Sequence, residues 1–186
     1  MTADGVADVS VCWPDAFTTD RLRATPLCEH DGSLFAALYA DAPTMAQVAA
    51  PLDPTATARA FAAALRQMRR SPPAARYWRL DAGGVALGLL SLVADADCRT
   101  AETGLLLGAT GRAHGVGREA LSALLAQVLR PGGLAAVWTR HRNGHGAAEG
   151  LMRRLQFEVL RTEPGWMRWH MSAVRWRALA DGTGSV

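Results

Sequence analysis

Hydrophobic positions along the chain follow two alternating spacings, and each spacing predicts a different kind of element. Apolar residues at intervals of three and four are clearest at Phe61, Leu65 and Met68, which is typical of one face of a helix. Pro72 and Pro73 end that helix. A first helix is predicted after Asp31, which is placed to cap it, and further helices over residues 55–70, 119–129 and 147–155.

Short apolar or alternating runs between turn residues predict the strands. The clearest pair is a hairpin, in which residues 77–80 and 85–93 flank the turn at 81–84. Strands are predicted over residues 21–27, 77–80, 85–93, 101–107, 134–139, 157–160 and 167–174. Two early helices, a β-meander and then a β-loop-α-β-α-β-β order predict a mixed α/β (α+β) layered fold.

Composition and charge fit one ordinary globular domain. The chain has 186 residues, of which 49% are hydrophobic and 20% charged. Its formal net charge of +3 comes from arginines scattered along the chain, because lysine does not occur, and this pattern argues against a nucleic-acid-binding face. The sequence shows neither a secretion signal nor a membrane span, so we expect a cytoplasmic protein without a membrane partner.

Cysteine and histidine positions do not predict a metal site. The three cysteines cannot all pair and have no ligand-like spacing, which favours a reducing compartment: Cys12, Cys28 and Cys98. His141 and His145 are four residues apart, but the turn signal Asn143-Gly144 between them breaks helical spacing. We therefore expect no bound metal.

The stretch with the most chemical information is a loop between an apolar strand and a helix, residues 112–117, Arg-Ala-His-Gly-Val-Gly. The first amides of a helix lack partners within the helix, and its dipole favours anions there. Gly115 and Gly117 remove side chains, so a phosphate could approach the backbone, and Arg112 could add a charged donor. The loop therefore predicts a diphosphate site, with a plain strand-to-helix turn as the alternative.

Two other phosphate loops fit less well. A Walker A motif is excluded because the chain has no lysine. The dinucleotide fingerprint lacks its third glycine, since Ala120 stands at that position, and no first βαβ unit surrounds the loop.

Four motifs in order give the chain a family resemblance over residues 17–176. They are Arg-x-x-Gly-x-Gly at 112–117, Thr-Asp-Arg-Leu at 19–22, Ala-Glu-Thr-Gly at 101–104, and the segment from His145 to Phe157. Together they resemble the GNAT acyltransferase superfamily, particularly its RimJ/RimL-like branch. The resemblance implies a central mixed, mostly antiparallel sheet with a splayed V between two adjacent strands and flanking helices. It also implies a flexible segment at residues 1–16, a single domain over 17–176 and a tail over 177–186.

The resemblance assigns the binding of acetyl-CoA, as co-substrate, to residues near this V. The pantetheine arm is expected along the backbone of the strand ending at residue 107, and the pyrophosphate on the following loop. The implied binding residues are Leu105, Leu106, Leu107, Arg112, Ala113, His114, Gly115, Val116, Gly117, Arg118 and Asn143.

Direct attack of an amine on a thioester needs a route for the ammonium proton and an acid for the departing thiolate. Glu102 is the first candidate for the proton route, through water, and His170 the second; each also fits a structural role. For the acid, the chain has Ala148 and Met152 where the family often has serine and tyrosine. Three readings stay open: His145 protonates the thiolate, the thiolate leaves unassisted, or activity is lost.

Two further sequence features carry expectations about packing. Gln156 replaces the customary glycine before Phe157, which predicts a turn there without a positive φ. The alternation over residues 167–171 predicts that Trp169 packs into the core, with an aromatic wall at the acceptor site as the alternative.

The predicted function is an acetyl-CoA-dependent N-acetyltransferase that acts on a primary amine, either a protein or peptide N-terminus or a small molecule. The alternatives are a non-catalytic acyl-CoA-binding sensor and an acyltransferase that uses a longer chain. The partners expected are acyl-CoA and the amine, without nucleic acid, for a monomer or homodimer.

Overall fold

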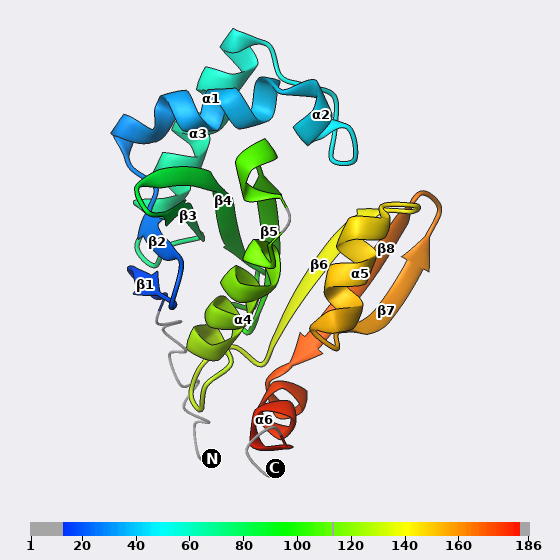
Figure 1. The fold of residues 1–186 in the computed structure, drawn as a ribbon. Helices are drawn as coiled ribbons and strands as arrows, with labels where there is room; N and C mark the ends of the chain where they lie inside the picture. The colour runs from blue at the N-terminus through cyan, green and yellow to red at the C-terminus, as the bar shows by residue number, and fades with distance from the viewer. Residues whose placement is uncertain (1–12, 113, 183–186) are drawn as a thin grey trace, which may run out of the picture.

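The computed structural model describes residues 13–112 and 114–182 (Figure 1). In this part of the chain, eight strands form one sheet in the order β1-β2-β3-β4-β5-β6-β8-β7. The strands are β1 (Phe17–Thr18), β2 (Arg23–Pro26), β3 (Ala75–Ala82), β4 (Val85–Ala94), β5 (Thr100–Leu107), β6 (Ala136–Arg142), β7 (Glu158–Glu163) and β8 (Trp166–Ser172). Neighbouring strands are antiparallel except for β5 and β6, which are parallel. The predicted mixed, mostly antiparallel sheet is confirmed.

Helices cover both faces of the sheet. They are α1 (Gly32–Ala40), α2 (Ala42–Met45), α3 (Pro54–Met68), α4 (Val116–Val128), α5 (Gly146–Arg154) and α6 (Ala173–Gly182), with 3-10 turns η1 (Glu29–Asp31) and η2 (Ala109–Gly111). On one face, Leu121, Leu124 and Leu125 of α4 are buried against Trp78 and Leu90 of the sheet. On the other face, α1 and α3 pack over β3 to β5, in a second apolar cluster around Phe35, Leu38, Ala64 and Leu89.

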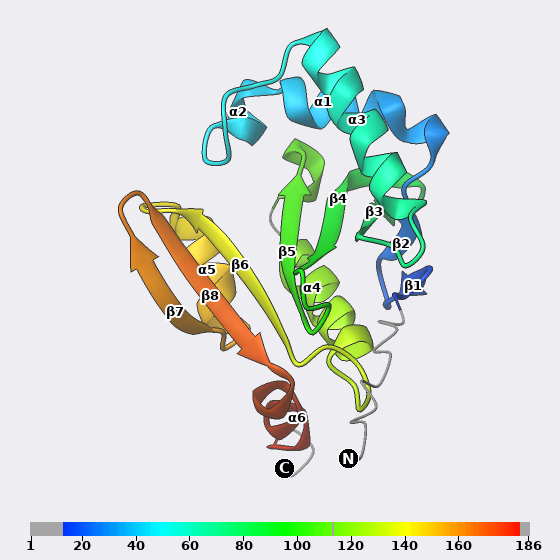
Figure 2. The same cartoon turned by 180° about the vertical axis from the view of Figure 1, so that it is seen from behind.

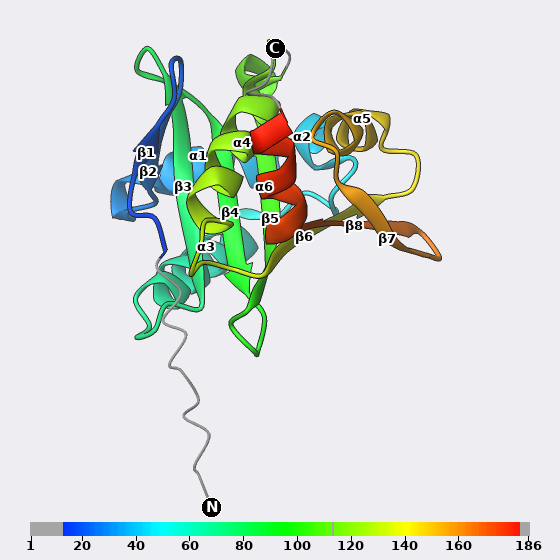
Figure 3. The ribbon, with the colours of Figure 1, turned by 90° about the horizontal axis from the view of Figure 1, so that it is seen from below.

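The sheet opens between β5 and β6. The two strands pair only where Thr100–Glu102 meets Ala136–Trp138, and beyond that point they diverge. Figure 3 shows from below that β6, β8 and β7 extend away from the half formed by β2 to β5. Helix α4 flanks one side of this opening and α5 the other, so the predicted V is present.

Several element boundaries differ from the prediction. The last strand ends at Ser172, not at residue 174, because an alanine-rich segment forms α6 and places Trp176 and Leu179 against the main core. Helix α4 begins at Val116 and not at 119, because Gly115 serves as its N-cap. Asp31 occupies the N-cap position of α1, but its carboxylate accepts from the Cys28 amide (2.9 Å) and does not cap that helix.

The turn at Gln156 also differs from the prediction. Gln156 has φ +60°, although a residue with a side chain was expected to avoid a positive φ. Its amide bonds the Arg153 carbonyl and the Phe157 amide bonds the Met152 carbonyl, both at 3.0 Å. This pair of bonds is the Schellman ending of a helix, which needs a left-handed residue at this position whatever its side chain. The geometry of the helix end therefore overrides the preference of glutamine.

Candidate active site

The loop between η2 and α4 has the backbone of an anion site. Gly115 is the N-cap of α4 with φ +77°, a left-handed conformation that glycine adopts without strain. It follows His114, which is itself at φ +53°. No side chain among the described residues caps the first turn, so the leading amides of a 13-residue helix are directed at the loop. The diphosphate site on this loop stays a prediction.

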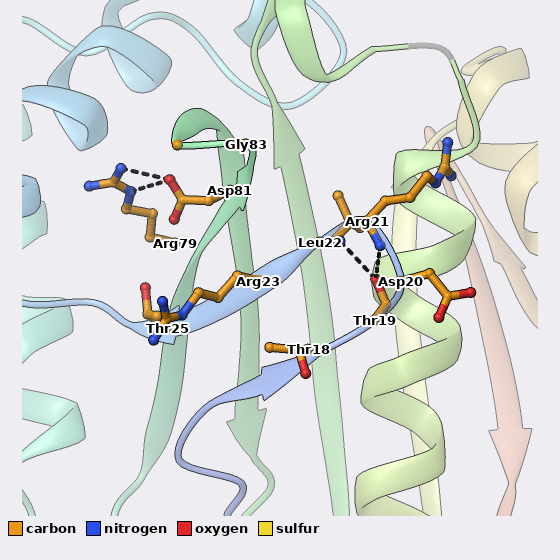
Figure 4. A pocket seen from close by; sticks show the side chains of 11 residues that line it. Thr18, Thr19, Asp20, Arg21, Leu22, Arg23, Thr25, Arg79, Asp81 and Gly83 are labelled. Carbon is orange, nitrogen blue, oxygen red and sulfur yellow. Dashed lines mark hydrogen bonds and ion pairs between the residues drawn. The ribbon is translucent and has the colours of Figure 1, made fainter.

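A salt bridge from the first hairpin holds this end of α4. The Arg21 guanidinium pairs with the Glu119 carboxylate (Nε to Oε2, 2.7 Å) and donates to the His114 carbonyl (3.0 Å). Thr19 donates its hydroxyl to Glu119 and accepts from the amides of Arg21 and Leu22, at 3.3 and 2.9 Å (Figure 4). The motif at residues 19–22 marked this segment as part of the family resemblance. It did not predict that the segment would bind the loop before α4.

Arg112 and Gly117 face other partners than a phosphate. The Arg112 guanidinium donates to the Leu107 carbonyl (3.2 Å) and to Thr44 of α2, so it ties α2 to the end of β5. A Cβ on Gly117 would lie 3.1 Å from Leu105 Cδ2 and 3.3 Å from Leu151 Cδ2. Gly117 therefore lets α4 approach β5 and α5 at the opening, which is a packing role.

The remaining predicted loop residues vary in exposure. Val116 is buried, whereas His114 and Arg118 are exposed. Ala113 lies outside the described residues. Asn143 is exposed in the turn after β6, where its amide donates to the Gly165 carbonyl (3.1 Å).

The edge of β5 at the opening presents backbone groups. The Gly108 amide donates to the Leu87 carbonyl of β4 (2.9 Å), and the direction of backbone groups alternates along a strand. The amides of Leu105 and Leu107 therefore face the opening, where β6 no longer pairs with them. The Leu106 side chain packs into the cluster under α1 and α3. These edge amides are placed where the resemblance puts the pantetheine arm.

Glu102 lies where β5 and β6 separate. It is opposite Trp138 of β6, and its Oε1 lies 3.3 Å from Arg140 Nε. Burial raises the pKa of the Glu102 carboxyl, and the charges of Arg140 and Arg168 oppose that shift without cancelling it. A half-buried carboxylate with a raised pKa is a better proton acceptor than an ordinary glutamate.

His170 shares the Glu102 face of the sheet. Its register partner on β6 is Trp138, so His170 lies one strand further from β5 than Trp138 does. The alternation along β8 buries Trp169 and Met171 on the opposite face, as predicted from the sequence. Trp138 and Trp166 are the partly buried tryptophans of the Glu102 face, so an aromatic wall is present there as well.

The two histidines near α5 differ in their surroundings. His141 is buried and accepts from Trp169 Nε1 at its Nε2 (2.8 Å), so its Nδ1 is the nitrogen that donates to the Arg142 carbonyl (2.8 Å). His145 is the N-cap of α5, with its ring centroid 6.0 Å from that of His141. Burial, and secondarily His141, lowers the pKa of His145. His145 is therefore more readily neutral than an ordinary histidine.

One surface depression, of about 460 Å³, lies between β2 and the β3–β4 hairpin and is lined by Arg23, Arg79 and Asp81 among others (Figure 4). It is separate from the opening between β5 and β6, and Arg79 and Asp81 pair with each other across it (2.6 Å). The described residues contain no cluster of three or more His, Cys, Asp or Glu side chains suited to a metal ion. None of the described helices is both long and apolar enough to cross a membrane.

A splayed β5–β6 pair beside the uncapped start of a helix defines the class of acyl-CoA-dependent transferases. Residues 21–158 match the family model described as the acetyltransferase (GNAT) domain. The chain belongs to this family of N-acetyltransferases, as its four motifs predicted. No curated protein matches the sequence closely enough to count as a relative.

Solved structures with the same fold include three acetyltransferases in complex with CoA or acetyl-CoA. A spermidine N-acetyltransferase from Vibrio cholerae, in complex with CoA and spermine, is 13% identical (TM-score 0.72, 86% of this chain, 99% of that chain). RimL, the ribosomal L7/L12 α-N-protein acetyltransferase, in complex with CoA, is 15% identical (TM-score 0.71, 86% and 97%). The microcin C7 self-immunity acetyltransferase MccE, in complex with acetyl-CoA and AMP, is 14% identical (TM-score 0.72, 89% and 99%). These three likenesses show the shared fold.

Proposed function

We propose that this chain transfers an acetyl group from acetyl-CoA to a primary amine, by direct attack of the amine in a ternary complex. The observation that carries the proposal is the opening between β5 and β6 beside the amino end of α4. An extended chain that ends in a diphosphate fits such a combination of strand edge and helix terminus. The structures of the same fold named above contain CoA or acetyl-CoA, which supports the choice of co-substrate.

The residues present fit the co-substrate along this line. The first amides of α4, after Gly115, would hold the diphosphate. Among the described residues, apart from its chain neighbours, Gly115 has only Arg21 Nη2 within 4 Å of its Cβ position, at 3.6 Å, so this place is accessible. The edge amides of Leu105 and Leu107 would bind carbonyl oxygens of the pantetheine arm and stabilise the oxyanion of the reacting thioester.

Glu102 would receive the proton that the amine loses, through a water molecule. As the amine nitrogen bonds to the acetyl carbon and the carbon–sulfur bond breaks, the nitrogen becomes cationic and must release one proton. A carboxylate with a raised pKa accepts that proton and passes it to solvent. His170 lies further from the strand edge, so we assign it no proton transfer.

The thiolate would leave without an acid. Ala148 and Met152 have no proton to donate. The lowered pKa of His145 means that its ring is less often protonated than that of an ordinary histidine. A thiol with a pKa of about 8.5 is an adequate leaving group without assistance. We infer that His145, which occupies the N-cap position of α5, does not protonate the sulfur.

The acceptor belongs to one of two groups, protein or peptide N-termini and small-molecule amines. Both occur among acetyltransferases of this fold, since one acts on spermidine and another on a ribosomal protein. We place the reaction in the cytoplasm, because acetyl-CoA is present there and cysteines stay reduced.

Calorimetry with acetyl-CoA tests the binding half of the proposal. Gly115→Glu would place a negative side chain in the cradle and should weaken binding by at least about a hundredfold, since it adds repulsion and blocks the amides. Gly132→Glu is the matched control: Gly132 also has a positive φ (+78°) and open space around its Cβ position, but lies beyond the far end of α4. Equal affinity in the two variants would contradict the placement of the site.

A thiol-release assay with a panel of amines tests the catalytic half. Release of CoA that depends on an amine supports the transferase. Tight binding of acetyl-CoA without release for any amine would favour the sensor, and a preference for longer acyl-CoA would favour the third alternative.

A further inference from the structure

The Glu102 face of β6 and β8 carries a ladder of arginines and tryptophans. Side chains that alternate along the two strands bring Trp138 opposite His170, Arg140 opposite Arg168, and Arg142 opposite Trp166. We call these six residues the Arg-Trp face. Figure 2 shows β6 and β8 from this side with no helix in front of them, whereas α3 lies in front of β3. The face is thus open and adjoins Glu102.

Stacking holds the arginines of this face in place. The Arg168 guanidinium lies 4.0 Å from the centroid of the Trp138 ring. Arg140 and Arg142 lie 5.4 and 5.3 Å from the centroid of Trp166. Guanidinium groups fixed over indole rings keep their N–H edges available to a planar anion, at little further cost in side-chain entropy.

The charges on the Arg-Trp face do not balance. Glu102 is matched by Arg140 (3.3 Å), and Glu158 by Arg175 (3.0 Å). Asp95 accepts from Trp138 Nε1 (2.8 Å), and Glu163 is engaged in an interaction of its own. Within the described part of the chain, neither Arg142 nor Arg168 forms an ion pair with a carboxylate, and each is stacked on a tryptophan, although the charge of Arg168 also acts on Glu102 from a distance. Two arginines without an ion pair therefore lie on the face that adjoins the proposed base.

We propose that the Arg-Trp face binds the acceptor and selects an amine that carries a carboxylate or a phosphate, with Arg168 and Arg142 as the anion-binding residues. This inference rests on the proposed transferase function and specifies its substrate class. An anion held over β6 and β8 places its neighbouring amine toward Glu102, because Glu102 and Trp138 are register partners. A polycationic amine would meet two unmatched positive charges and is disfavoured.

Paired amines that differ in one charged group test the proposal. O-Phosphoethanolamine is compared with ethanolamine, glycine with glycinamide, and spermidine serves as the polycation, all in the thiol-release assay. The anionic member of each pair should have a kcat/KM at least about tenfold higher, as expected for a hydrogen bond to a charged group. Equal or inverted preference would overturn the inference, while retained turnover would leave the transferase function standing.

Variants locate the preference on the face. Arg168→Gln and Arg142→Gln should each reduce the preference for the anionic amine about tenfold, without changing the affinity for acetyl-CoA. The matched control is Arg153→Gln, because Arg153 also stacks on a tryptophan, Trp169 at 5.8 Å, but belongs to α5 on the opposite side of the sheet. Loss of the preference in the control, or its survival in both test variants, contradicts the assignment.

A binding measurement decides the case if no amine of the panel is acetylated. The indole N–H signals of Trp138 and Trp166 are followed by NMR while O-phosphoethanolamine or ethanolamine is added to the protein with CoA. Shifts that require the phosphate and that disappear in Arg168→Gln support the anion site. Identical spectra with both amines at millimolar concentration would overturn it. Failure to bind CoA, by contrast, would count against the proposed function and not against the anion site.

Discussion

Arg21 and Glu119, 98 residues apart in sequence, form an ion pair that joins the first hairpin to the first turn of α4. Two guanidinium nitrogens, Nε and Nη2, contact the same carboxylate oxygen, Oε2. The guanidinium also binds the His114 carbonyl, so one side chain fixes both the helix and the loop before it. Nothing in the hydrophobic pattern of either segment predicts this contact. It makes the geometry of the proposed diphosphate cradle dependent on the amino-terminal strand.

Arg21→Leu should therefore affect binding more than stability. The Arg21 side chain is 54% exposed, so the loss in free energy of unfolding should stay below about 1 kcal/mol. The dissociation constant for acetyl-CoA should rise about tenfold, because the loop loses its anchor. Calorimetry and thermal unfolding measure the two effects. Arg69→Leu, which breaks the exposed pair with Glu29, is the control and should change neither.

The same ion pair predicts a pH dependence of stability. Burial alone would favour the neutral acid, but the hydrogen bonds from Thr19 and Arg21 outweigh it and lower the pKa of Glu119 below its ordinary 4.5. A lowered carboxyl pKa contributes stability above pH 4.5, and that contribution is lost as the pH falls through the lower, folded-state pKa. The stability difference between wild type and Arg21→Leu should thus be constant from pH 5 to 7 and shrink below pH 4.5. A difference that grows on acidification would exclude this account.

Glu102 should set the acidic limb of the activity profile. Burial raises the pKa of Glu102, so turnover should fall with decreasing pH at a point above the ordinary value of 4.5. Arg140→Gln removes a charge that lowers this pKa and should move the limb to higher pH. Glu102→Gln should lower kcat by about a hundredfold or more and abolish the limb, with little change in acetyl-CoA affinity. The limb must stay in place when the acceptor amine is exchanged for one of different pKa; if it follows the amine, Glu102 is not the group observed.

His145→Gln tests whether His145 acts as the general acid or only occupies the N-cap position of α5. Because the pKa of His145 is lowered, the ring should be mostly neutral at pH 7.5, and its replacement should change kcat by less than about threefold. Glutamine keeps a polar side chain at the N-cap of α5. A loss of a hundredfold or more, with an alkaline limb that disappears, would show that the thiolate does receive its proton from His145.

Gln156→Gly should stabilise the protein. Gln156 has φ +60°, which costs a residue with a Cβ about 1 to 2 kcal/mol, and part of this gain is offset by the larger freedom of glycine in the unfolded chain. We expect a net gain of about 0.5 to 1 kcal/mol, or roughly 2 °C in thermal unfolding. Gln156→Ala keeps the strained φ and should give no gain. An equal increase for alanine would mean that the glutamine side chain, not its backbone, is unfavourable.

Local signals in the sequence were strong where a short segment decides its own structure. The spacing of Phe61, Leu65 and Met68 was sufficient to predict α3. The glycines at 83 and 84 were sufficient to predict the turn of the β3–β4 hairpin. The loop before α4 was readable because an uncapped helix start after Gly115 follows from a few adjacent residues. At Gln156 the geometry of the helix end overrode the preference of the residue, and in α6 packing against the core decided a structure that the local pattern did not predict.

The candidate site could be predicted only in part, because many of its contacts join residues that are far apart in the sequence. Glu102 was predicted as a site residue from its motif, but its partner Arg140 and the influence of Arg168 come from two other strands. Gly117 was predicted to make room for a phosphate. The structure adds a packing reason for a glycine there, since Leu105 and Leu151 approach it from β5 and α5. No spacing along the chain encodes contacts of this kind.

The sequence by itself determined most of the helices and strands, the family and the backbone character of the loop at 112–117, because these depend on residues close together in the chain. Tertiary structure alone decided that Arg112 turns to α2, that Arg21 clamps α4, and that two arginines are left without carboxylates beside Glu102. The physical reason is that a charge is matched or unmatched only by its neighbours in space. Strand register, and not sequence separation, brings those neighbours together.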